Sequence, residues 1–531
     1  MHEPCGGDTL KPLAAINDGT FYGCLSLTDI TVPDAVVTIG EDAFKECSNL
    51  QSVTLGSSVG VINDHAFWRC SSLTDVSFKG PVTELGYGVF MDCVSLQDIT
   101  IPGTAANVEG ATFSGCKNLK SANVCGLGPW MFSDCISLES VTFSNSITSI
   151  PQVAFCNCHN LKSVTIPGSV TEIGSSAFAG CSSLTELTIP GSVTKIGSSA
   201  FEGCSGLTEL IIPDGVTSIG EAAFSGCSGL ESVTLSNSIS YINSSLFSGC
   251  TSLKGITISD AVKEIGRYAF SGCTSLESVT IGKSVTSIWD YAFSGCSSLT
   301  ELTIGHSVGR IGDNAFSGCS SLTEVTLPNF VTKIGYGAFQ DCTSLTGIII
   351  PDGVTKICGN TFMNCSALKN VTLGKNVKEI EGSTFVNCTS LTGITFLDAV
   401  TEIGYGAFSG CTALASVTFG KNLAVIDGCA FARCSSLTSI VIPESVTEIV
   451  SQAFEDCNKL LSVYSLNPVP PTMSWDVFSK YFTYPNGTLY VPYGSLDAYR
   501  NAAEWSNFVN IQEFDPTGIS GVEATAAWTL A

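Results

Sequence analysis

Charged side chains are scarce in this sequence of 531 residues, at 13% of the composition against about 25% in an average soluble protein. Basic residues are the scarcer kind, because 23 Lys and Arg stand against 47 Asp and Glu, which gives a net charge of −24. The phosphates of a nucleic acid and an anionic membrane surface would repel such a chain. We therefore expect no nucleic-acid partner.

Long apolar runs are missing as well. No stretch of 18 or more apolar residues occurs, so we predict no membrane span. A hydrophobic content of 44% nevertheless excludes a disordered chain. The first eight residues contain neither the basic nor the apolar region of a secretory signal, which leaves both an intracellular and an exported protein open.

The patterns typical of catalytic and metal sites are also absent. Histidine occurs four times, and no G-x-S-x-G, H-E-x-x-H or phosphate-binding glycine-rich loop is present. No C-x-x-C occurs, although Cys156 and Cys158 form a Cys-x-Cys pair, which is a weak metal or redox signal. We predict no catalytic residues, no metal site and no cofactor.

What the sequence does contain is a repeat of 23 residues. Twenty of the 25 cysteines lie in register at that spacing, with one shorter step of 19 residues from Cys116 to Cys135. A Phe lies three residues before each of these cysteines, and a Leu lies three residues after it. Three columns filled 20 times indicate a solenoid, in which each repeat forms one coil stacked on its neighbours.

Residues 177–199 show how one coil forms. Leu184, Leu187 and Ile189 alternate with polar residues, which predicts a short strand with one buried face. Pro190-Gly191 ends this strand, and the segment with Val193 and Ile196 returns the chain. The Ala-Phe-x-x-Cys segment that opens each coil is too short for more than a helical turn.

The cysteines admit two structural interpretations, a disulfide framework and a ladder of buried thiols. An odd number of cysteines leaves at least one unpaired, and stacked columns of identical inward residues suit buried thiols that act as small hydrophobes. We therefore expect a thiol ladder in the repeat. Five cysteines lie outside the register, namely Cys5, Cys125, Cys156, Cys358 and Cys429.

The unit C-x-x-L-x-x-[VIL]-x-[IL]-P-x-x-V-x-x-I-G-x-x-A-F resembles the 23-residue leucine-rich repeat of bacterial BspA-like surface proteins, the Treponema type, over roughly residues 10–465. The resemblance implies a right-handed curved array of about 20 coils, with short parallel strands on the concave face and turns or short helical turns on the convex face. Family members are typically secreted or cell-surface proteins associated with adhesion to host matrix proteins or to other cells. The resemblance thus implies an extracellular or cell-surface location.

We expect three parts along the chain: a solenoid over residues 1–465 with a short coil at 117–135, a capping segment over 466–515, and a flexible tail over 516–531. The T-L-Y-V-P-x-G-S-x-x-A-Y stretch resembles the segment that closes such arrays in gut Bacteroidetes proteins. In this α+β cap we predict strands at 488–492 and 508–514, and a helix over 496–505 with Ser495 as N-cap. A separate aromatic ligand site in this segment is the alternative.

The residue seven positions after each cysteine is the best-defined surface feature. It is Thr in 14 of 20 coils and lies between two inward apolar residues, so it should point outward from the concave face. An exposed strand position suits a β-branched residue for structural reasons alone. The functional alternative is a flat hydroxyl array that contacts glycans or an extended protein, and its candidate residues are Thr165, Thr188, Thr234, Thr257, Thr280 and Thr303. The apolar residues Ile211, Ile349, Val441 and Tyr464 interrupt this column and are expected to make local apolar contacts.

Aromatic residues supply the remaining candidates. The short coil must bend or gap the solenoid near Trp130, which either fills the defect or lines a pocket there. Trp68, Trp289, Tyr268 and Tyr291 fall in the columns of the convex side, where isolated exposed rings are ordinary.

These features favour a non-enzymatic, monomeric, exported recognition scaffold, adhesin-like, that binds an extracellular protein or glycan. The first alternative is a structural protein of the cell envelope without a soluble ligand. The second is a glycan-degrading enzyme in the C-terminal segment, which would need a carboxylate pair about 5–9.5 Å apart. That segment is too short for a usual catalytic domain, and its carboxylates are Asp476, Asp497, Glu504, Glu513, Asp515 and Glu523.

Overall fold

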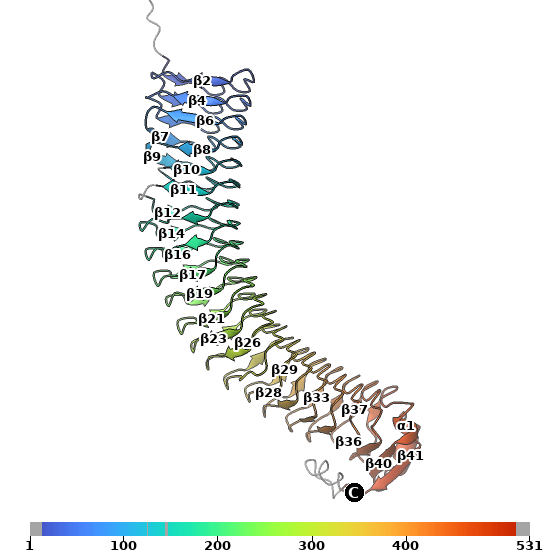
Figure 1. The fold of residues 1–531 in the computed structure, drawn as a ribbon. Helices are drawn as coiled ribbons and strands as arrows, with labels where there is room; N and C mark the ends of the chain where they lie inside the picture. The colour runs from blue at the N-terminus through green and yellow to red at the C-terminus, as the bar shows by residue number, and fades with distance from the viewer. Residues whose placement is uncertain (1–12, 125, 144–146, 517–531) are drawn as a thin grey trace, which may run out of the picture. The chain divides into compact units, whose positions relative to one another are not determined.

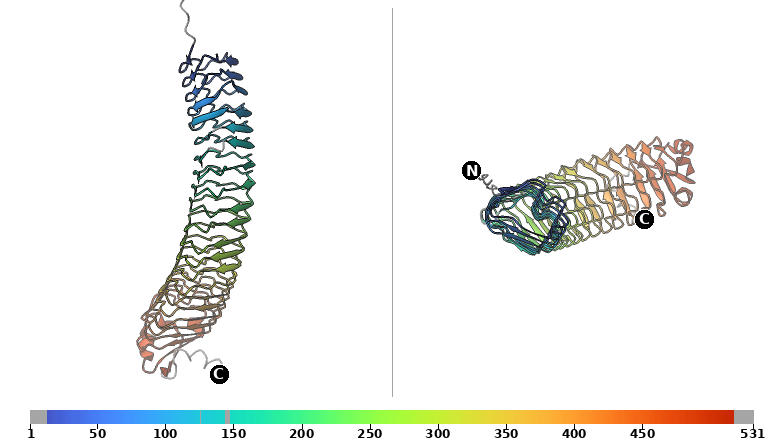
Figure 2. Two further views of the ribbon diagram at one scale, coloured as in Figure 1. Left: turned by 90° about the vertical axis from the view of Figure 1, so that its left-hand side faces the viewer. Right: turned by 90° about the horizontal axis from the view of Figure 1, so that it is seen from above.

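In a computed structural model, the structure describes residues 13–124, 126–143 and 147–516, and the chain divides into two compact units, residues 1–239 and 240–531. Each unit is a stack of coils whose short parallel strands pair with those of the next coil (Figure 1). The right-hand view of Figure 2 shows the coils of the first unit overlying one another. Both units are parallel β-solenoids, which confirms the predicted fold class. Cys5, Cys125 and the predicted tail from residue 517 lie outside the described residues.

In 19 of the 20 coils the first strand begins five residues after the cysteine, where the L-x-x-L-x-L pattern predicts it; among the described residues the coil of Cys319 has no such strand. In the first unit these strands are β2 (Asp29–Thr31), β4 (Ser52–Leu55), β6 (Asp75–Phe78), β8 (Asp98–Thr100), β10 (Ser121–Val124), β11 (Ser140–Phe143), β13 (Ser163–Val164), β15 (Glu186–Leu187), β17 (Glu209–Ile211) and β19 (Ser232–Thr234). In the second unit they are β21 (Gly255–Ile258), β23 (Ser278–Ile281), β25 (Glu301–Thr303), β28 (Gly347–Ile349), β30 (Asn370–Thr372), β32 (Gly393–Thr395), β34 (Ser416–Thr418), β36 (Ser439–Ile442) and β38 (Ser462–Ser465).

A second strand column precedes the Ala-Phe segments. In the first unit it contains β1 (Ala15–Ile16), β3 (Thr38–Ile39), β5 (Val61–Ile62), β7 (Val82–Leu85), β9 (Gly103–Val108), β12 (Ser149–Ile150), β14 (Glu172–Ile173), β16 (Lys195–Ile196) and β18 (Ser218–Ile219). In the second unit it contains β20 (Tyr241–Ile242), β22 (Glu264–Ile265), β24 (Ser287–Ile288), β26 (Arg310–Ile311), β27 (Lys333–Ile334), β29 (Lys356–Ile357), β31 (Glu379–Ile380), β33 (Glu402–Ile403), β35 (Val425–Ile426), β37 (Glu448–Ile449) and β39 (Thr472–Met473).

The sequence did not predict this second column. From the sequence, Val193 and Ile196 were expected only to lead the chain back to the next coil. In the structure Ile196 belongs to β16, which pairs in parallel with β14 and β18, so that Ile173, Ile196 and Ile219 lie in one row of buried side chains. Lys195, the other residue of β16, points to solvent. Within each unit the coils are therefore joined by two columns of strand pairing, each of which is interrupted at several coils.

The Ala-Phe-x-x-Cys segment forms turns, and its main chain makes a third set of hydrogen bonds between coils. The amides of Ser176, Phe178 and Gly180 donate to carbonyl oxygens of the next coil at 2.7–2.9 Å. Ser176 and Gly180 adopt φ values of +52° and +76° in order to aim these amides along the stack. A left-handed conformation costs a non-glycine residue about 1–2 kcal/mol, which these hydrogen bonds offset.

The core consists of stacked copies of the repeat side chains. In the first unit the Phe rings of successive coils lie 5.0–5.6 Å apart and within 11° of parallel. In the second unit the same column runs from Phe247 to Phe478 at 5.0–5.7 Å. Offset stacking at these distances is favourable beyond the burial of the rings themselves.

The repeat cysteines form a ladder of thiols beside these rings. Cys181 donates its Sγ–H to the carbonyl oxygen of Phe155 in the preceding coil at 3.1 Å, and Cys273 makes the equivalent bond to Phe247 at 3.1 Å. The same contact recurs along both units. Cysteine thus fills a narrow column and also satisfies a main-chain oxygen, which an aliphatic residue of similar size could not do.

The short coil keeps the first ladder and breaks the second. β10 pairs with both β8 and β11, whereas β9 ends one sheet of the second column and β12 begins the next. The four missing residues are therefore taken from the second strand. Gly128 lies where a Cβ would be 2.3 Å from the main-chain oxygen of Glu109, so the shortened path passes tightly beneath the preceding coil.

The coil geometry continues beyond the sequence repeat. Phe478 stacks on Phe454 at 5.3 Å, β39 pairs with β37, and β40 (Thr488–Pro492) pairs with β38 and with β41 (Asn510–Phe514). The remaining elements are α1 (Thr483–Asn486), α2 (Leu496–Asn501) and the 3₁₀ turn η1 (Trp505–Asn507). The buried Trp505 donates its indole N–H to the carbonyl oxygen of Pro471 at 2.8 Å.

Strand β40 has the predicted bounds, but the predicted helix over 496–505 is too long. α2 ends at Asn501, and the chain turns before η1 so that Trp505 can enter the core. Ser495 occupies the N-cap position without a side-chain hydrogen bond to the helix. Glu513 takes over the capping role, since its Oε1 accepts from the amides of Gly494 and Leu496.

Alkaline pH should destabilise the fold through the buried thiols. Burial raises the pKa of Cys227, Cys273, Cys365 and Cys411 to about 12, against about 8.5 for an exposed thiol. Above about pH 8.5, the cysteines of the unfolded chain lose protons that the same cysteines keep in the folded chain. The free energy of unfolding should therefore fall by about 1.4 kcal/mol per pH unit for each such thiol.

Urea titrations under reducing conditions between about pH 7 and pH 10 measure this effect. The free energy of unfolding should not depend on the thiols' ionisation below about pH 8 and should decline steeply above it. A thiol reagent that labels few cysteines in buffer and all of them in urea provides the control. A free energy of unfolding that is constant across the alkaline range would contradict the thiol ladder.

Replacement of Gly128 by alanine should destabilise the short coil. The added Cβ would meet the oxygen of Glu109, and overpacking of this kind costs about 1–3 kcal/mol. Gly168→Ala is the matched control, because nothing lies within 4 Å of its Cβ position. Thermal unfolding compares the two variants, and equal melting temperatures would show that the short coil accommodates the methyl group without cost.

Candidate functional site

The threonine column lies on the exposed side of the first strands. Thr257, Thr280 and Thr303 occupy successive strands β21, β23 and β25 and are direct neighbours in register. Each is exposed, while Ile256 and Ile258 on either side of Thr257 and Val279 and Ile281 on either side of Thr280 are buried. The alternation predicted from the sequence therefore presents a row of hydroxyl groups to solvent.

The other predicted threonines are exposed but less regularly placed. Thr165 and Thr188 directly follow the short strands β13 and β15, and Thr234 lies opposite Ile211. Ile211 and Ile349 interrupt the column with exposed fractions of 67% and 69%. Tyr464, by contrast, is half-buried and stacks on Tyr490 at 4.4 Å.

The threonine face is hollowed around β32. A cavity of about 340 Å³ is lined by Thr372, Thr395, Gly393, Leu397 and Ser416, among others. Gly393 leaves this space free because it has no side chain. A Cβ there would lie 2.5 Å from the hydroxyl of Ser416. The polar rim of this cavity consists of hydroxyl groups and main-chain atoms.

Trp130 lies at the turn of the short coil. Its φ of +55° matches the left-handed residue that opens the turn in other coils, and its amide donates to the carbonyl oxygen of Gln152 at 3.2 Å. The side chain is 39% exposed. Trp130 is thus held by its main chain, and its ring lines none of the three cavities described in this section.

The cysteines outside the repeat offer little chemistry. Burial raises the pKa of Cys156 and Cys358, with further contributions from nearby carboxylates, which disfavours the reactive thiolate. Cys429 lines a cavity of about 330 Å³ and its Sγ lies 3.7 Å from the hydroxyl of Tyr405. Within residues 13–124, 126–143 and 147–516, no group of three or more His, Cys, Asp or Glu side chains is placed to hold a metal ion.

The C-terminal carboxylates serve structural roles. Oε2 of Glu504 accepts hydrogen bonds from the hydroxyl of Tyr484 and from the amide of Asp476, while Asp476 also pairs with Lys480 at 3.0 Å. Glu513 caps α2. These three carboxylates are committed to holding the segment together.

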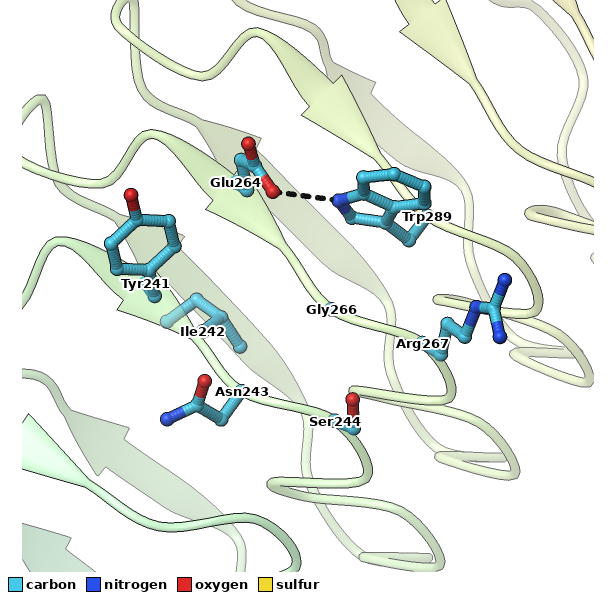
Figure 3. Close-up of a pocket in the computed structure, with 8 residues that line it drawn as sticks. All are labelled: Tyr241, Ile242, Asn243, Ser244, Glu264, Gly266, Arg267 and Trp289. Atoms are coloured by element: carbon cyan, nitrogen blue, oxygen red, sulfur yellow. Dashed lines mark hydrogen bonds between the residues drawn. The ribbon is translucent and has the colours of Figure 1, made fainter.

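A third cavity joins aromatic and charged side chains on the second strand column of the second unit. It has a volume of about 390 Å³ and spans three successive coils, with Tyr241 in the first, Glu264, Gly266 and Arg267 in the second, and Trp289 in the third. Figure 3 shows the rings of Tyr241 and Trp289 on opposite sides of Glu264. The lining is completed by Ile242, Asn243 and Ser244.

The indole of Trp289 is fixed by its neighbours. Its Nε1–H donates to Oε2 of Glu264 at 2.9 Å, and the guanidinium of Arg310 lies over the ring at 4.5 Å. Asp290 in turn pairs with Arg267 at 3.2 Å and with Arg310 at 3.6 Å. This network holds Trp289 at the edge of the cavity. Arg310 contacts the indole ring but does not line the cavity.

A similar cluster occurs in the first unit. The ring of Trp68 lies beneath Lys45 at 4.5 Å and Arg69 at 4.8 Å, and His65 contacts it at 4.9 Å. Its Nε1–H donates to Asp92 at 3.2 Å. Trp68 lines none of the three cavities described in this section, whereas Trp289 lines the third.

The sequence analysis named Trp289 as an isolated ring and did not identify the cavity. Tyr241, Glu264 and Arg310 each lie nine residues before a repeat cysteine, and Trp289 lies seven before one. Because the 23-residue register stacks equal positions, this arithmetic places all four on neighbouring coils. The signal lies in the variable columns of the repeat, where neighbouring coils carry different residues.

A family model described as a BspA type leucine rich repeat region (6 copies) matches residues 14–128, 126–254, 241–369 and 332–461. The chain belongs to the BspA-type leucine-rich repeat family.

Solved structures of bacterial leucine-rich repeat proteins are similar to this BspA-type chain. A protein from Bacteroides ovatus ATCC 8483 is 26% identical over 79% of this chain and 92% of its own, with a TM-score of 0.55. A leucine rich cell surface protein from Faecalibacterium prausnitzii A2-165 is 27% identical over 69% of this chain and 85% of its own, with a TM-score of 0.34. No curated protein sequence matches the chain.

The described helices of this BspA-type chain are short, and none has the length and apolar character that crossing a membrane requires.

Replacement of Thr257, Thr280 and Thr303 together by alanine should leave the fold intact. The three side chains are exposed, and strand preference differs by at most about 1 kcal/mol between residues. Circular dichroism and urea unfolding of the triple variant measure this. A collapse of the unfolding transition would show that the hydroxyl row is structural and unsuitable for testing binding.

Proposed function

We propose that this protein is a non-enzymatic recognition scaffold, exported to the cell surface or the surrounding medium, that binds an extracellular protein or glycan through its repeat surface. The observation that carries the proposal is the row of exposed hydroxyls on successive strands, exemplified by Thr257, Thr280 and Thr303. The second strand column and the main-chain hydrogen bonds of the turns also join coils to their neighbours, so this surface has little conformational freedom to lose on binding.

The acidic composition supports the same proposal. A net charge of −24 disfavours non-specific contact with polyanions and favours a soluble, monomeric protein. Specific contacts must then come from hydroxyls, from exposed apolar residues such as Ile211 and Ile349, and from the cavities. Membership of the BspA-type family supports the adhesin-like role and the extracellular location.

The test is saturable binding of the purified chain to a panel of extracellular matrix proteins and mucin glycoproteins at low and high salt. We expect at least one ligand to bind with a dose dependence that free ligand competes. The triple threonine variant should weaken this binding, while Thr31→Ala, a single change in the same column of the first unit, should leave it nearly unchanged.

A folded, monodisperse protein that binds nothing on the panel would contradict the proposal. Self-association or retention in the cell envelope, together with the blank panel, would instead favour a structural role without a soluble ligand.

A further inference from the structure

We propose that the cavity between Tyr241 and Trp289 binds an uncharged glycan chain. The inference rests on the proposed function, because it assigns part of the recognition to one site and names the chemistry of its ligand. The volume of about 390 Å³ lies within the range of about 300–1,000 Å³ for small-molecule sites.

The aromatic residues of the cavity suit the apolar faces of sugar rings. Tyr241 is 53% exposed, and Trp289 lies two coils further along the stack, which is about 9–10 Å at the spacing of parallel strands. The C–H groups of a pyranose ring present positive edges, and the face of an aromatic ring is negative, so the two stack favourably. Two such rings at this separation can contact sugar residues of one chain.

The polar groups between the rings suit hydroxyls. Asn243, Ser244 and Glu264 line the cavity and together offer both donors and acceptors. Glu264 is already oriented, because its Oε2 accepts from the indole of Trp289 at 2.9 Å. Preorganised acceptors of this kind bind a hydroxyl without the cost of ordering a free side chain.

Gly266 lines the cavity in the coil between those of Tyr241 and Trp289 (Figure 3). A Cβ at this position would lie 2.8 Å from the main-chain oxygen of Ile242. Glycine here thus allows the close packing of the two coils that carry Tyr241 and Glu264.

The charges around the cavity favour an uncharged ligand. Arg267 and Arg310 both pair with Asp290, and Glu264 supplies the second carboxylate, so positive and negative charges balance. A phosphate or an acidic sugar would meet no surplus of positive charge. A quaternary ammonium group would have to share Trp289 with the guanidinium of Arg310, which already lies over that ring.

The exposure of Tyr241 indicates that the ligand is part of a chain. A ring that is 53% exposed in the free protein leaves the cavity open at its side. An internal segment of an oligosaccharide can enter such a site, whereas a free monosaccharide would be only partly enclosed. Affinity for an oligosaccharide should therefore exceed that for its monosaccharide.

The experiment is calorimetry of the full chain with cellohexaose, xylohexaose, mannohexaose and oligomers of N-acetyllactosamine. We expect at least one of these neutral probes to bind, with a Kd that does not change between low and high salt because the ligand carries no charge. Tyr241→Ala and Trp289→Ala should each weaken binding about tenfold or more, the loss expected for a central aromatic contact. Trp289→Phe should retain more affinity than Trp289→Ala, since it keeps an aromatic face.

Tyr268→Ala is the matched control. Tyr268 stacks on Tyr291 at 4.9 Å in the same coils and does not line the cavity, so its removal should leave the Kd within about twofold. Tyr241→Ala removes an exposed side chain, so its folding is not in question even if a Trp289 variant proves unstable.

Failure of all neutral oligosaccharides to bind would overturn the inference, as would binding that the Tyr241 and Trp289 variants leave unchanged. Binding of sialyllactose or phosphocholine at the cavity in place of the neutral probes would also overturn it. If a matrix protein binds and the triple threonine variant weakens it while no oligosaccharide binds, this inference fails and the proposed function stands. If no ligand of any kind binds, both fail.

Discussion

Main-chain hydrogen bonding between successive coils is the constraint on which the rest of the structure depends. It fixes the separation of coils at about 4.8 Å, so in the regular coils a strand residue lies directly on the residue 23 positions away. Each column must therefore tolerate contact with its own copy. Phe meets this demand by offset stacking, and Cys by donating to the carbonyl oxygen of a Phe in the preceding coil. Like charges meet it poorly, since stacked carboxylates repel. Charged residues are accordingly few, and opposite charges form ion pairs between coils, as Glu172 and Lys195 do at 2.7 Å. Like charges are nevertheless neighbours in register at Glu379 and Glu402 and at Arg310 and Lys333.

The short coil shows what the constraint permits. Four residues can be lost only where the chain is not needed to carry the stack, and they are lost from the second strand while β10 keeps both of its partners. Trp130 retains the left-handed turn of the other coils, so the break does not spread to the Phe column, where Phe113 and Phe132 stack at 5.6 Å. The defect is thus confined to one ladder.

The sequence predicted those parts of the fold that the repeat makes uniform. The pattern of Leu184, Leu187 and Ile189 extends beyond the two-residue strand β15 and indicates it, whereas the two-residue strand Lys195–Ile196 has one inward residue, Ile196, and shows no period. The helix ending at Asn501 was extended too far, because local helix preference could not reveal that Trp505 is drawn into the core. The threonine face was predicted from its column, and its exposure agrees with that prediction. The cavity was not, since its residues occupy columns whose contents change from coil to coil.

The two kinds of surface therefore suit different tasks. A uniform column such as that of Thr257, Thr280 and Thr303 presents the same group to a ligand in every register, so it can add contacts along an extended partner but cannot fix where the partner lies. Selectivity requires a place where neighbouring coils differ. Around Tyr241, Glu264 and Trp289 three successive coils contribute a phenol, a carboxylate and an indole, and the network around Asp290 gives that arrangement a single geometry. In a solenoid, a specific site must arise where the repeat is least exact, and its position along the stack then fixes the register of everything that binds beside it.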